Sequence, residues 1–271
     1  MSTTNSTIRE EGLALVVAIG LLTRIPVPRI GEVGPAVLGR SLHWYPVAGL
    51  IIGLILVLTV ALVPGHFLPG NGLLVAALTV TLWVALTGAL HLDGLADCAD
   101  AWVGGMGDRK RTLAIMKDPA CGPMGVTAVV LTLLLKVAAL ETLLTHPAAG
   151  WWWLAPVAAR AMLSLAFITL PYVRAGGMGD GLGANASRPG LTLATLLVLT
   201  LLALGLSTTL WWLWLTLTVV LFALWRLAVL RRLGGFTGDC AGALVELLEV
   251  ALLVFAALFL TATSVAGSAA L

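Results

Sequence analysis

The chain has 271 residues, of which 60% are hydrophobic and only 10% charged, and its formal net charge is +2. No soluble domain of this size needs so large an apolar fraction, so the composition excludes an ordinary soluble enzyme and indicates a polytopic membrane protein. The small net charge says little by itself, and we expect no nucleic-acid partner. The placement of the charges is more informative.

The apolar segments predict an all-α, polytopic membrane helical bundle. The first apolar run, Gly12 to Thr23, is short for a span and predicts an interfacial or partly inserted helix. Seven further runs are near or above the ~20 residues that a ~30 Å hydrocarbon core requires. These predicted spans are residues 42–63, 73–91, 124–144, 151–172, 191–209, 211–230 and 241–265. We expect a single integral membrane domain over residues 1–271.

Lysine and arginine occur in alternate connections between these spans. The basic connections are residues 24–41, 92–123, 173–190 and 231–240, whereas residues 64–72 and 145–150 carry no lysine or arginine. By the positive-inside rule, the basic connections are predicted to be cytoplasmic. Nearly all acidic residues fall on the same side, and acids do not determine topology, so this clustering favours an active site that faces the cytoplasm.

Three aspartates follow the second predicted span at helical spacing. Asp93, Asp97 and Asp100 occupy positions i, i+4 and i+7, so a helix would place them on one face. Unpaired charges at a membrane surface are costly, and a bound divalent cation would remove that cost. The pattern therefore predicts an Mg²⁺ site that a phosphate-bearing substrate can reach. The alternative is a solvated acidic helix end.

The same connection carries a glycine-rich turn and a basic cluster. Gly104, Gly105 and Gly107 precede Arg109 and Arg111, and backbone N–H groups and guanidinium groups suit phosphate oxygens. The pair Lys117 and Asp118 follows in the same connection. The alternative is a topology signal or a contact with anionic lipid.

A second acidic pattern opens the last predicted span. Asp239, Glu246 and Glu249 follow a glycine-rich turn at spacings of seven and three residues, so they share a helix face. Asp239 can cap this helix, and Gly242 permits a close helix approach. The two glutamates lie within an apolar helix and need partners. Candidate partners are Arg226, Arg160, Lys136 or a metal ion, and a buried ion pair between helices is the structural alternative.

Three single residues are weaker candidates for binding. Asn185 follows a glycine pair and offers an amide to a phosphate, a ribose or a base, although asparagine beside glycine is more often a turn residue. His91 adjoins the aspartates, although a single histidine there is more often a hydrogen-bonded interface residue. Arg24 precedes two prolines and can bind a phosphate or a helix C-terminus.

These residues suit metal-dependent transfer of a phosphate-containing group, and their motifs resemble the cobalamin synthase family, the adenosylcobinamide-GDP ribazoletransferases. The matching motifs occur in family order over nearly the whole chain, and HLDGLAD followed by IMKD is the most specific combination. They are TRIPVP at 23–28, YPVAG at 45–49, HLDGLAD at 91–97 with Asp100, IMKD at 115–118 with Gly122 and Gly125, GLG at 181–183, and GFTGD at 235–239 with Gly242, Ala243 and Glu246.

The resemblance implies a late step of cobalamin assembly in the prokaryotic inner membrane. The family transfers a cobinamide-phosphate group from adenosylcobinamide-GDP to α-ribazole or its 5′-phosphate, releases GMP and uses Mg²⁺. The resemblance implies that Asp93, Asp97 and Asp100 bind Mg²⁺, with Asp118 and Asp239 as further ligands or the base. Lys117, Arg109 and Arg111 would contact phosphate, and Arg24, His91, Asn185 and Glu246 are further substrate-binding candidates. The resemblance leaves two kinds of protein partner to be tested, namely a second copy of the chain and other cobalamin-assembly enzymes.

The sequence departs from the family pattern at two points and leaves two rivals. Position 98 is cysteine where threonine is common, which argues against a required ligand there. After Asp118 the chain reads Pro119-Ala120-Cys121, where the family often has a serine and an arginine, so we place no substrate contact there. A CDP-alcohol phosphotransferase or aspartate-rich prenyltransferase would also use Mg²⁺, but their motifs are absent. A transporter would place ionisable groups near the bilayer midplane, whereas these acids gather at one face.

Overall fold

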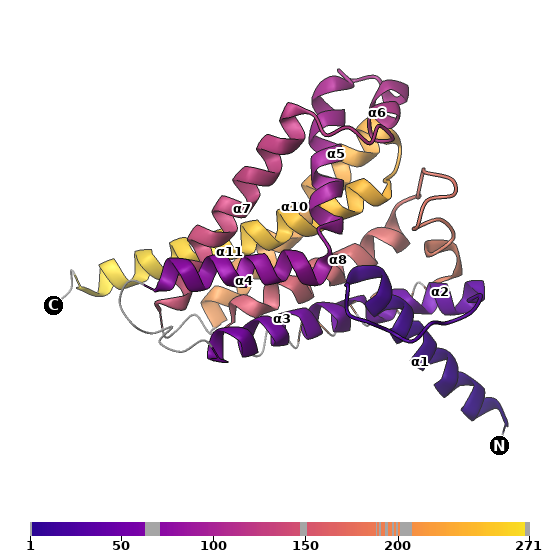
Figure 1. Ribbon diagram of the computed structural model, residues 1–271, viewed down its shortest axis with the longest axis horizontal. Helices are drawn as coiled ribbons and strands as arrows, with labels where there is room; N and C mark the ends of the chain where they lie inside the picture. The colour runs from indigo at the N-terminus through magenta and orange to yellow at the C-terminus, as the bar shows by residue number, and fades with distance from the viewer. Residues whose placement is uncertain are drawn as a thin grey trace.

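The computed structural model describes residues 2–62, 71–146, 151–187, 189, 191–192, 195–196, 198, 200 and 208–268. These residues are helical, and their only extended pairing is an isolated parallel bridge between Tyr172 and Phe236. The elements are α1 (Ser2–Leu22), α2 (Pro35–Ser41), η1 (Leu42–Trp44), α3 (Tyr45–Leu62), α4 (Gly72–Thr87), α5 (Leu90–Gly104), α6 (Arg109–Ile115), α7 (Pro123–Leu144), η3 (Trp152–Leu154), α8 (Ala155–Thr169), η4 (Gly183–Asn185), α10 (Thr208–Leu233) and α11 (Gly238–Ser268). The predicted all-α class is confirmed (Figure 1).

Five helical stretches of the described chain are long and apolar enough to cross a membrane, in agreement with five predicted spans. They are Pro35–Leu62, Pro123–Leu144, Trp152–Thr169, Trp211–Leu233 and Gly238–Ala262. A sixth candidate is α4 together with α5, which meet at an angle of 88°. The predicted span 191–209 lies largely outside the described residues, so the total of seven stays a prediction. Helix α1 begins ten residues before the predicted run and is not among the candidate spans.

The break between α4 and α5 corrects the predicted span 73–91. Helix α4 ends at Thr87 because Gly88 adopts a left-handed conformation with φ of 62°, a common helix stop. Ala89 follows with φ of 58°, which costs about 1–2 kcal/mol for a residue with a side chain. The two residues turn α5 almost perpendicular to α4. The aspartates of α5 therefore run across the end of the bundle and do not continue along α4 (Figure 1).

Helix α11 is the centre of the bundle and packs against α5, α7, α8 and α10. Its buried leucines Leu244, Leu248 and Leu252 contribute to the main core. Where α11 crosses α5, a Cβ atom on Gly94 would lie 2.7 Å from the carbonyl oxygen of Asp239, and one on Gly242 would lie 3.0 Å from that of His91. The expected close approach at Gly242 is confirmed. It brings the aspartates of α5 next to the start of α11.

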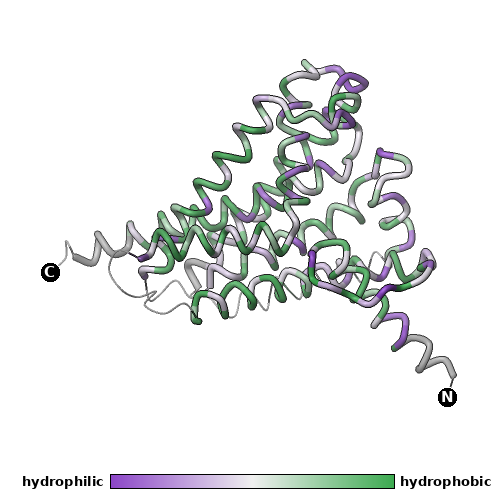
Figure 2. Tube along the Cα trace, viewed as in Figure 1, coloured by the Kyte–Doolittle hydropathy of each residue, from purple (hydrophilic) through white to green (hydrophobic). Residues whose placement is uncertain are grey.

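Hydrophilic residues gather at one end of this bundle. Figure 2 shows them along α5, α6 and the segment before η4, whereas α3 and α4 are largely hydrophobic. This is the end at which the predicted cytoplasmic connections 92–123 and 173–190 meet.

Candidate functional site

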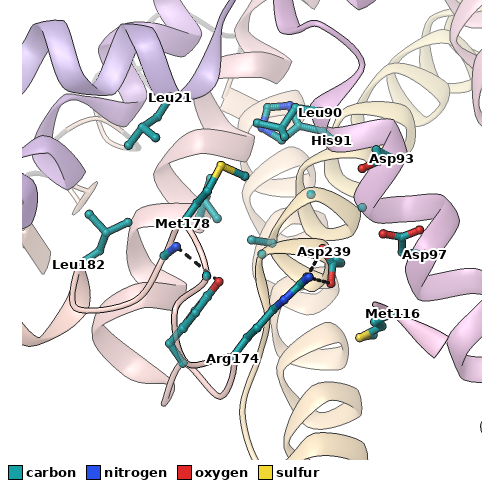
Figure 3. Close-up of a pocket in the computed structure, with 18 of the residues that line it drawn as sticks. Leu21, Leu90, His91, Asp93, Asp97, Met116, Arg174, Met178, Leu182 and Asp239 are labelled. Carbon is teal, nitrogen blue, oxygen red and sulfur yellow. Dashed lines mark hydrogen bonds and ion pairs between the residues drawn. The ribbon is translucent and has the colours of Figure 1, made fainter. Parts of the chain in front are cut away.

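A cavity of about 650 Å³ opens at the hydrophilic end of the bundle. Its walls come from α5, the segment 116–119 after α6, the loop between Tyr172 and Leu182, and the first turn of α11, with further side chains from α1, α3 and α8. Sequence segments far apart in the chain therefore meet at one site. Figure 3 shows the side chains of this cavity.

Four of the five predicted aspartates line the cavity, and three of them come from α5 and α11. Asp93 and Asp97 extend from α5, and Asp239 lies opposite them at the start of α11 (Figure 3). Asp239 accepts hydrogen bonds from Arg174 Nη1 at 3.1 Å and 2.9 Å and from Thr237 Oγ1 at 3.2 Å. Arg174 pairs with Asp239, and the four aspartates on the cavity wall outnumber its lysine and arginine, which leaves an excess of negative charge.

This excess charge changes the acidity of Asp97. Partial burial, followed by the charges of Asp93 and Asp239, raises the pKa of Asp97 to about 6. This carboxylate lines the cavity at the hydrophilic end of the bundle. A cation bound among the three carboxylates would favour the ionised form of Asp97 and remove much of the repulsion.

The carboxylates fit Mg²⁺ in the way this ion usually binds. Within the described residues, no group of three or more histidine, cysteine, aspartate or glutamate side chains forms a ready metal cage. Mg²⁺ seldom needs such a cage, because it keeps several waters and binds through one or two carboxylates together with substrate phosphates. Asp93 and Asp97, one helical turn apart on the cavity wall, provide two such carboxylates.

Lys117 and Asp118 also line the cavity, although they lie 20 residues or more from Asp93 and Asp97 in the sequence. Both side chains are exposed. Asp118 Oδ1 accepts a hydrogen bond from the backbone N–H of Ala120 at 3.0 Å, which shapes the turn after α6. Lys117 therefore puts a cation on the cavity wall, where a substrate phosphate can reach it.

Asp100 shares the predicted face of α5 but does not line the cavity. Its carboxylate accepts hydrogen bonds from the backbone N–H groups of Gly122 at 2.6 Å and Gly125 at 2.9 Å, at the start of α7. A carboxylate next to a helix N-terminus satisfies donors that have no partner within the helix. Asp100 thus anchors α7, and the geometry gives it no place in a metal site with Asp93 and Asp97.

We expect Asp100→Ala to lower stability without weakening the metal dependence of the activity. The substitution leaves two partly buried N–H groups without their acceptor, which costs about 1–3 kcal/mol. Thermal unfolding in lipid nanodiscs and a Mg²⁺ titration of activity would measure the two effects. Unchanged stability with a tenfold or greater rise in the Mg²⁺ requirement would instead make Asp100 a metal ligand.

Three arginines that were predicted to bind phosphate do not line the cavity: Arg109 and Arg111 of α6, and Arg24 of the first basic connection. Arg109 Nε donates to the carbonyl oxygen of Leu233 at 2.7 Å and ties α6 to α10. The backbone N–H of Arg111 donates to the N-cap residue Asp108. The backbone N–H of Arg24 donates to Leu86 O at 2.6 Å, and its side chain lies against Gly88 at the break between α4 and α5.

Asn185 and Glu246 are also absent from the cavity wall. The Asn185 amide donates to Gly181 O at 2.8 Å, which is the turn contact that the sequence offered as the alternative. Glu246 is buried and accepts a hydrogen bond from Lys136 Nζ at 2.7 Å. Glu246 therefore belongs to a buried ion pair between helices, which is the structural alternative to the predicted role in substrate binding.

This ion pair belongs to a buried charge network of two cations and two anions. Lys136 of α7 also contacts Glu249 Oε2 at 2.6 Å, and Arg160 of α8 binds the other oxygen of Glu249. Lys136 lies 4.6 Å from the ring centre of Trp83. The network is neutral and joins α7, α8 and α11 inside the apolar bundle, where an unpaired charge is costly.

The sequence did not single out Arg174 and Tyr172 as site residues. Arg174 is the partner of Asp239, and Tyr172 lines the cavity beside it. Their position depends on a short pairing, in which Val173 N donates to Phe236 O and Phe236 N donates to Pro171 O. Burial raises the pKa of the Tyr172 hydroxyl. The signal that could have identified this loop is the glycine-rich run after Arg174, at residues 176–183.

Sequence comparisons identify the family and the relatives that this chain resembles. The cobalamin-5-phosphate synthase family profile matches residues 14–257. The adenosylcobinamide-GDP ribazoletransferase of Pseudomonas aeruginosa strain PAO1 is 49% identical over 250 residues, covering 92% of this chain and 100% of the relative. The relative of the same name from Stutzerimonas stutzeri strain A1501 is 49% identical over 91% of this chain and 98% of its own length. No solved structure matches this chain.

Proposed function

Since this chain belongs to the cobalamin-5-phosphate synthase family, we propose that it transfers the adenosylcobinamide-phosphate group of adenosylcobinamide-GDP to α-ribazole or its 5′-phosphate, with release of GMP. The observation that carries the proposal is the 49% identity with a relative of that name over the relative's whole length. The cavity supports it, because the aspartates of the family motif HLDGLAD line its wall beside a lysine.

Asp93 and Asp97 are the residues that would hold Mg²⁺. When bound there, the ion neutralises the diphosphate of the donor substrate and stabilises the leaving phosphate. Lys117, on the same wall, contacts a phosphate oxygen and adds positive charge. The negative cavity itself repels a diphosphate, so the activity requires a divalent cation.

Asp239 is placed to act on the acceptor hydroxyl. Arg174 and Thr237 hold its carboxylate by three hydrogen bonds, which orient it at the N-terminus of α11. In the proposed reaction, Asp239 accepts the proton of the ribazole hydroxyl as that oxygen attacks the phosphorus on the cobinamide side. The bond from this phosphorus to the GMP oxygen then breaks. Asp118 is the second carboxylate that could take the proton.

The proposed reaction predicts Mg²⁺-dependent release of GMP. Membranes that contain the protein would be incubated with adenosylcobinamide-GDP and α-ribazole 5′-phosphate, with Mg²⁺ or with EDTA. We expect equal amounts of GMP and a new cobamide in the presence of Mg²⁺, and neither with EDTA. Folded protein that instead turns over a CDP-alcohol or a prenyl diphosphate would overturn the substrate assignment, and substrate transport without chemical change would overturn the enzyme assignment.

We further propose that the cavity faces the cytoplasm across the prokaryotic inner membrane. The support is the positive-inside rule applied to the connections 92–123 and 173–190, which contribute to the cavity wall. Single cysteines introduced at positions 108 and 148 would be tested in a background without the three native cysteines. A membrane-impermeant maleimide is expected to label position 108 only from the cytoplasmic side. Labelling of position 148 from that side would reverse the orientation.

A further inference from the structure

The neutral charge network reaches the cavity through one side chain, His91. Arg160 Nη2 lies 3.4 Å from His91 Nδ1, while Nη1 of the same guanidinium group binds Glu249 and contacts Pro156 O at 3.4 Å. Arg160 is completely buried, and His91 lies on the cavity wall with 3% of its surface exposed. A residue deep inside the bundle therefore contacts a residue of the site directly.

The chemistry of this contact determines where the proton of His91 resides. An arginine side chain has five N–H donors and no acceptor, so Nδ1 of His91 must supply a lone pair to it. A neutral imidazole has one protonated and one unprotonated nitrogen, which leaves the proton on Nε2.

We propose that Arg160 is a positioning residue that orients the His91 ring by donating to Nδ1, which leaves Nε2 as the N–H donor of this cavity-lining side chain. Glu249 holds Arg160 in place for this contact. The use of the Nε2–H group for a phosphate oxygen of the donor substrate rests on the proposed function. The tautomer of His91 does not depend on it.

The surroundings of His91 keep the ring at this position. Gly242 of α11 lies against the His91 backbone, since a Cβ atom there would be 3.0 Å from His91 O and 3.1 Å from His91 Cα. Asp93 follows two residues later on α5 and also lines the cavity. The ring thus lies between the buried Arg160 side chain and the acidic cavity. Nδ1 accepts a hydrogen bond from Arg160, and Nε2 is the nitrogen that donates.

The test is ¹⁵N NMR of the full-length protein in lipid nanodiscs, without substrate, at neutral pH. The chain contains four histidines, and His91→Gln identifies the His91 signals. We expect an unprotonated resonance for Nδ1 and a protonated one for Nε2, well separated. A proton on Nδ1, or a doubly protonated ring, would overturn the proposal.

Two double variants, each of which removes one cation and one anion, distinguish loss of the Arg160–His91 contact from general disruption of the buried charge network. Arg160→Met with Glu249→Gln removes one cation and one anion together with the contact to His91. Lys136→Met with Glu246→Gln removes the same charges but leaves Arg160, Glu249 and His91 in place. We expect the two ring resonances to move toward each other, as in an exchanging ring, only in the Arg160 variant. The same spectrum in wild type and the Arg160 variant would overturn the proposal.

A transfer assay of the Arg160 double variant adds the functional readout. Loss of a preorganised N–H donor is expected to lower kcat about tenfold or more, with a smaller change in KM. Because the NMR measurement needs no substrate, an inactive wild type would count against the proposed function. A proton on Nδ1 in the wild type, or an unchanged spectrum in the Arg160 variant, would count against the role of Arg160.

Discussion

Asp97→Asn is expected to abolish group transfer while the protein still folds and inserts into the membrane. The substitution keeps the size of the side chain and removes the negative charge that would bind Mg²⁺ beside Asp93. Metal-ion stabilisation of a transferring phosphate contributes several kcal/mol, so we expect a loss of about 10³-fold or more in kcat. The GMP-release assay in purified membranes measures it.

The location of Asp97 makes its removal harmless to the fold. Its carboxylate lies beside Asp93 and Asp239, and its pKa of about 6 reports an environment that disfavours the charge. Asparagine relieves this repulsion, so the free energy of unfolding is expected to stay constant or to rise slightly. Retained activity in Asp97→Asn would remove this residue from the metal site.

Asp108→Asn is the matched control for this prediction. Asp108 carries the same chemical group in the same connection, residues 92–123, but it caps α6 through Arg111 N at 2.7 Å and does not line the cavity. Asparagine is as good a helix cap as aspartate, so we expect near-normal activity and stability. An equal loss in both variants would show that the assay responds to disturbance of the loop and not to the metal site.

Glu249→Gln is expected to have the largest effect on stability. Glu249 is completely buried and binds both Lys136 and Arg160, so the neutral side chain leaves the network with two cations and one anion. Removing one partner of a buried ion pair typically costs about 3–5 kcal/mol. The free energy of unfolding in a defined detergent or nanodisc should fall by about that amount.

Glu10→Gln provides the comparison at the surface of the protein. Glu10 pairs with Arg40 at 3.1 Å, but both side chains are substantially exposed, at 41% and 33%. Exposed ion pairs contribute about 0–1 kcal/mol, so the free energy of unfolding should hardly change. Similar small effects in both variants would mean that water reaches Glu249, and that the network does not stabilise the bundle.

Much of the fold could be predicted because membrane helices must be long and apolar. The five confirmed spans follow directly from the hydrophobic runs, and the helical class follows from the need to satisfy backbone hydrogen bonds in lipid. The predicted span 73–91 was wrong at its end, because hydropathy does not register a left-handed turn. Gly88 and Ala89 stop α4 and redirect α5, although the surrounding residues remain apolar.

The candidate site could be predicted only in part, since identical charges have different partners in space. Asp93, Asp97 and Asp100 look equivalent in the sequence, yet the first two line the cavity and Asp100 anchors α7. The spacing of Asp239 and Glu246 suggested one functional face. In the structure, Asp239 lies on the cavity wall and Glu246 lies in the buried charge network.

The sequence by itself determined the class of the protein, its family and the face of α5 that carries the metal-binding candidates. These depend on composition, local spacing and motifs, which are properties of neighbouring residues. Only the tertiary structure decided that Arg174 pairs with Asp239 and that Arg160 contacts His91. The physical reason is that these contacts join segments 65 and 69 residues apart, brought together by the glycine crossing of α5 and α11 and by the buried charge network.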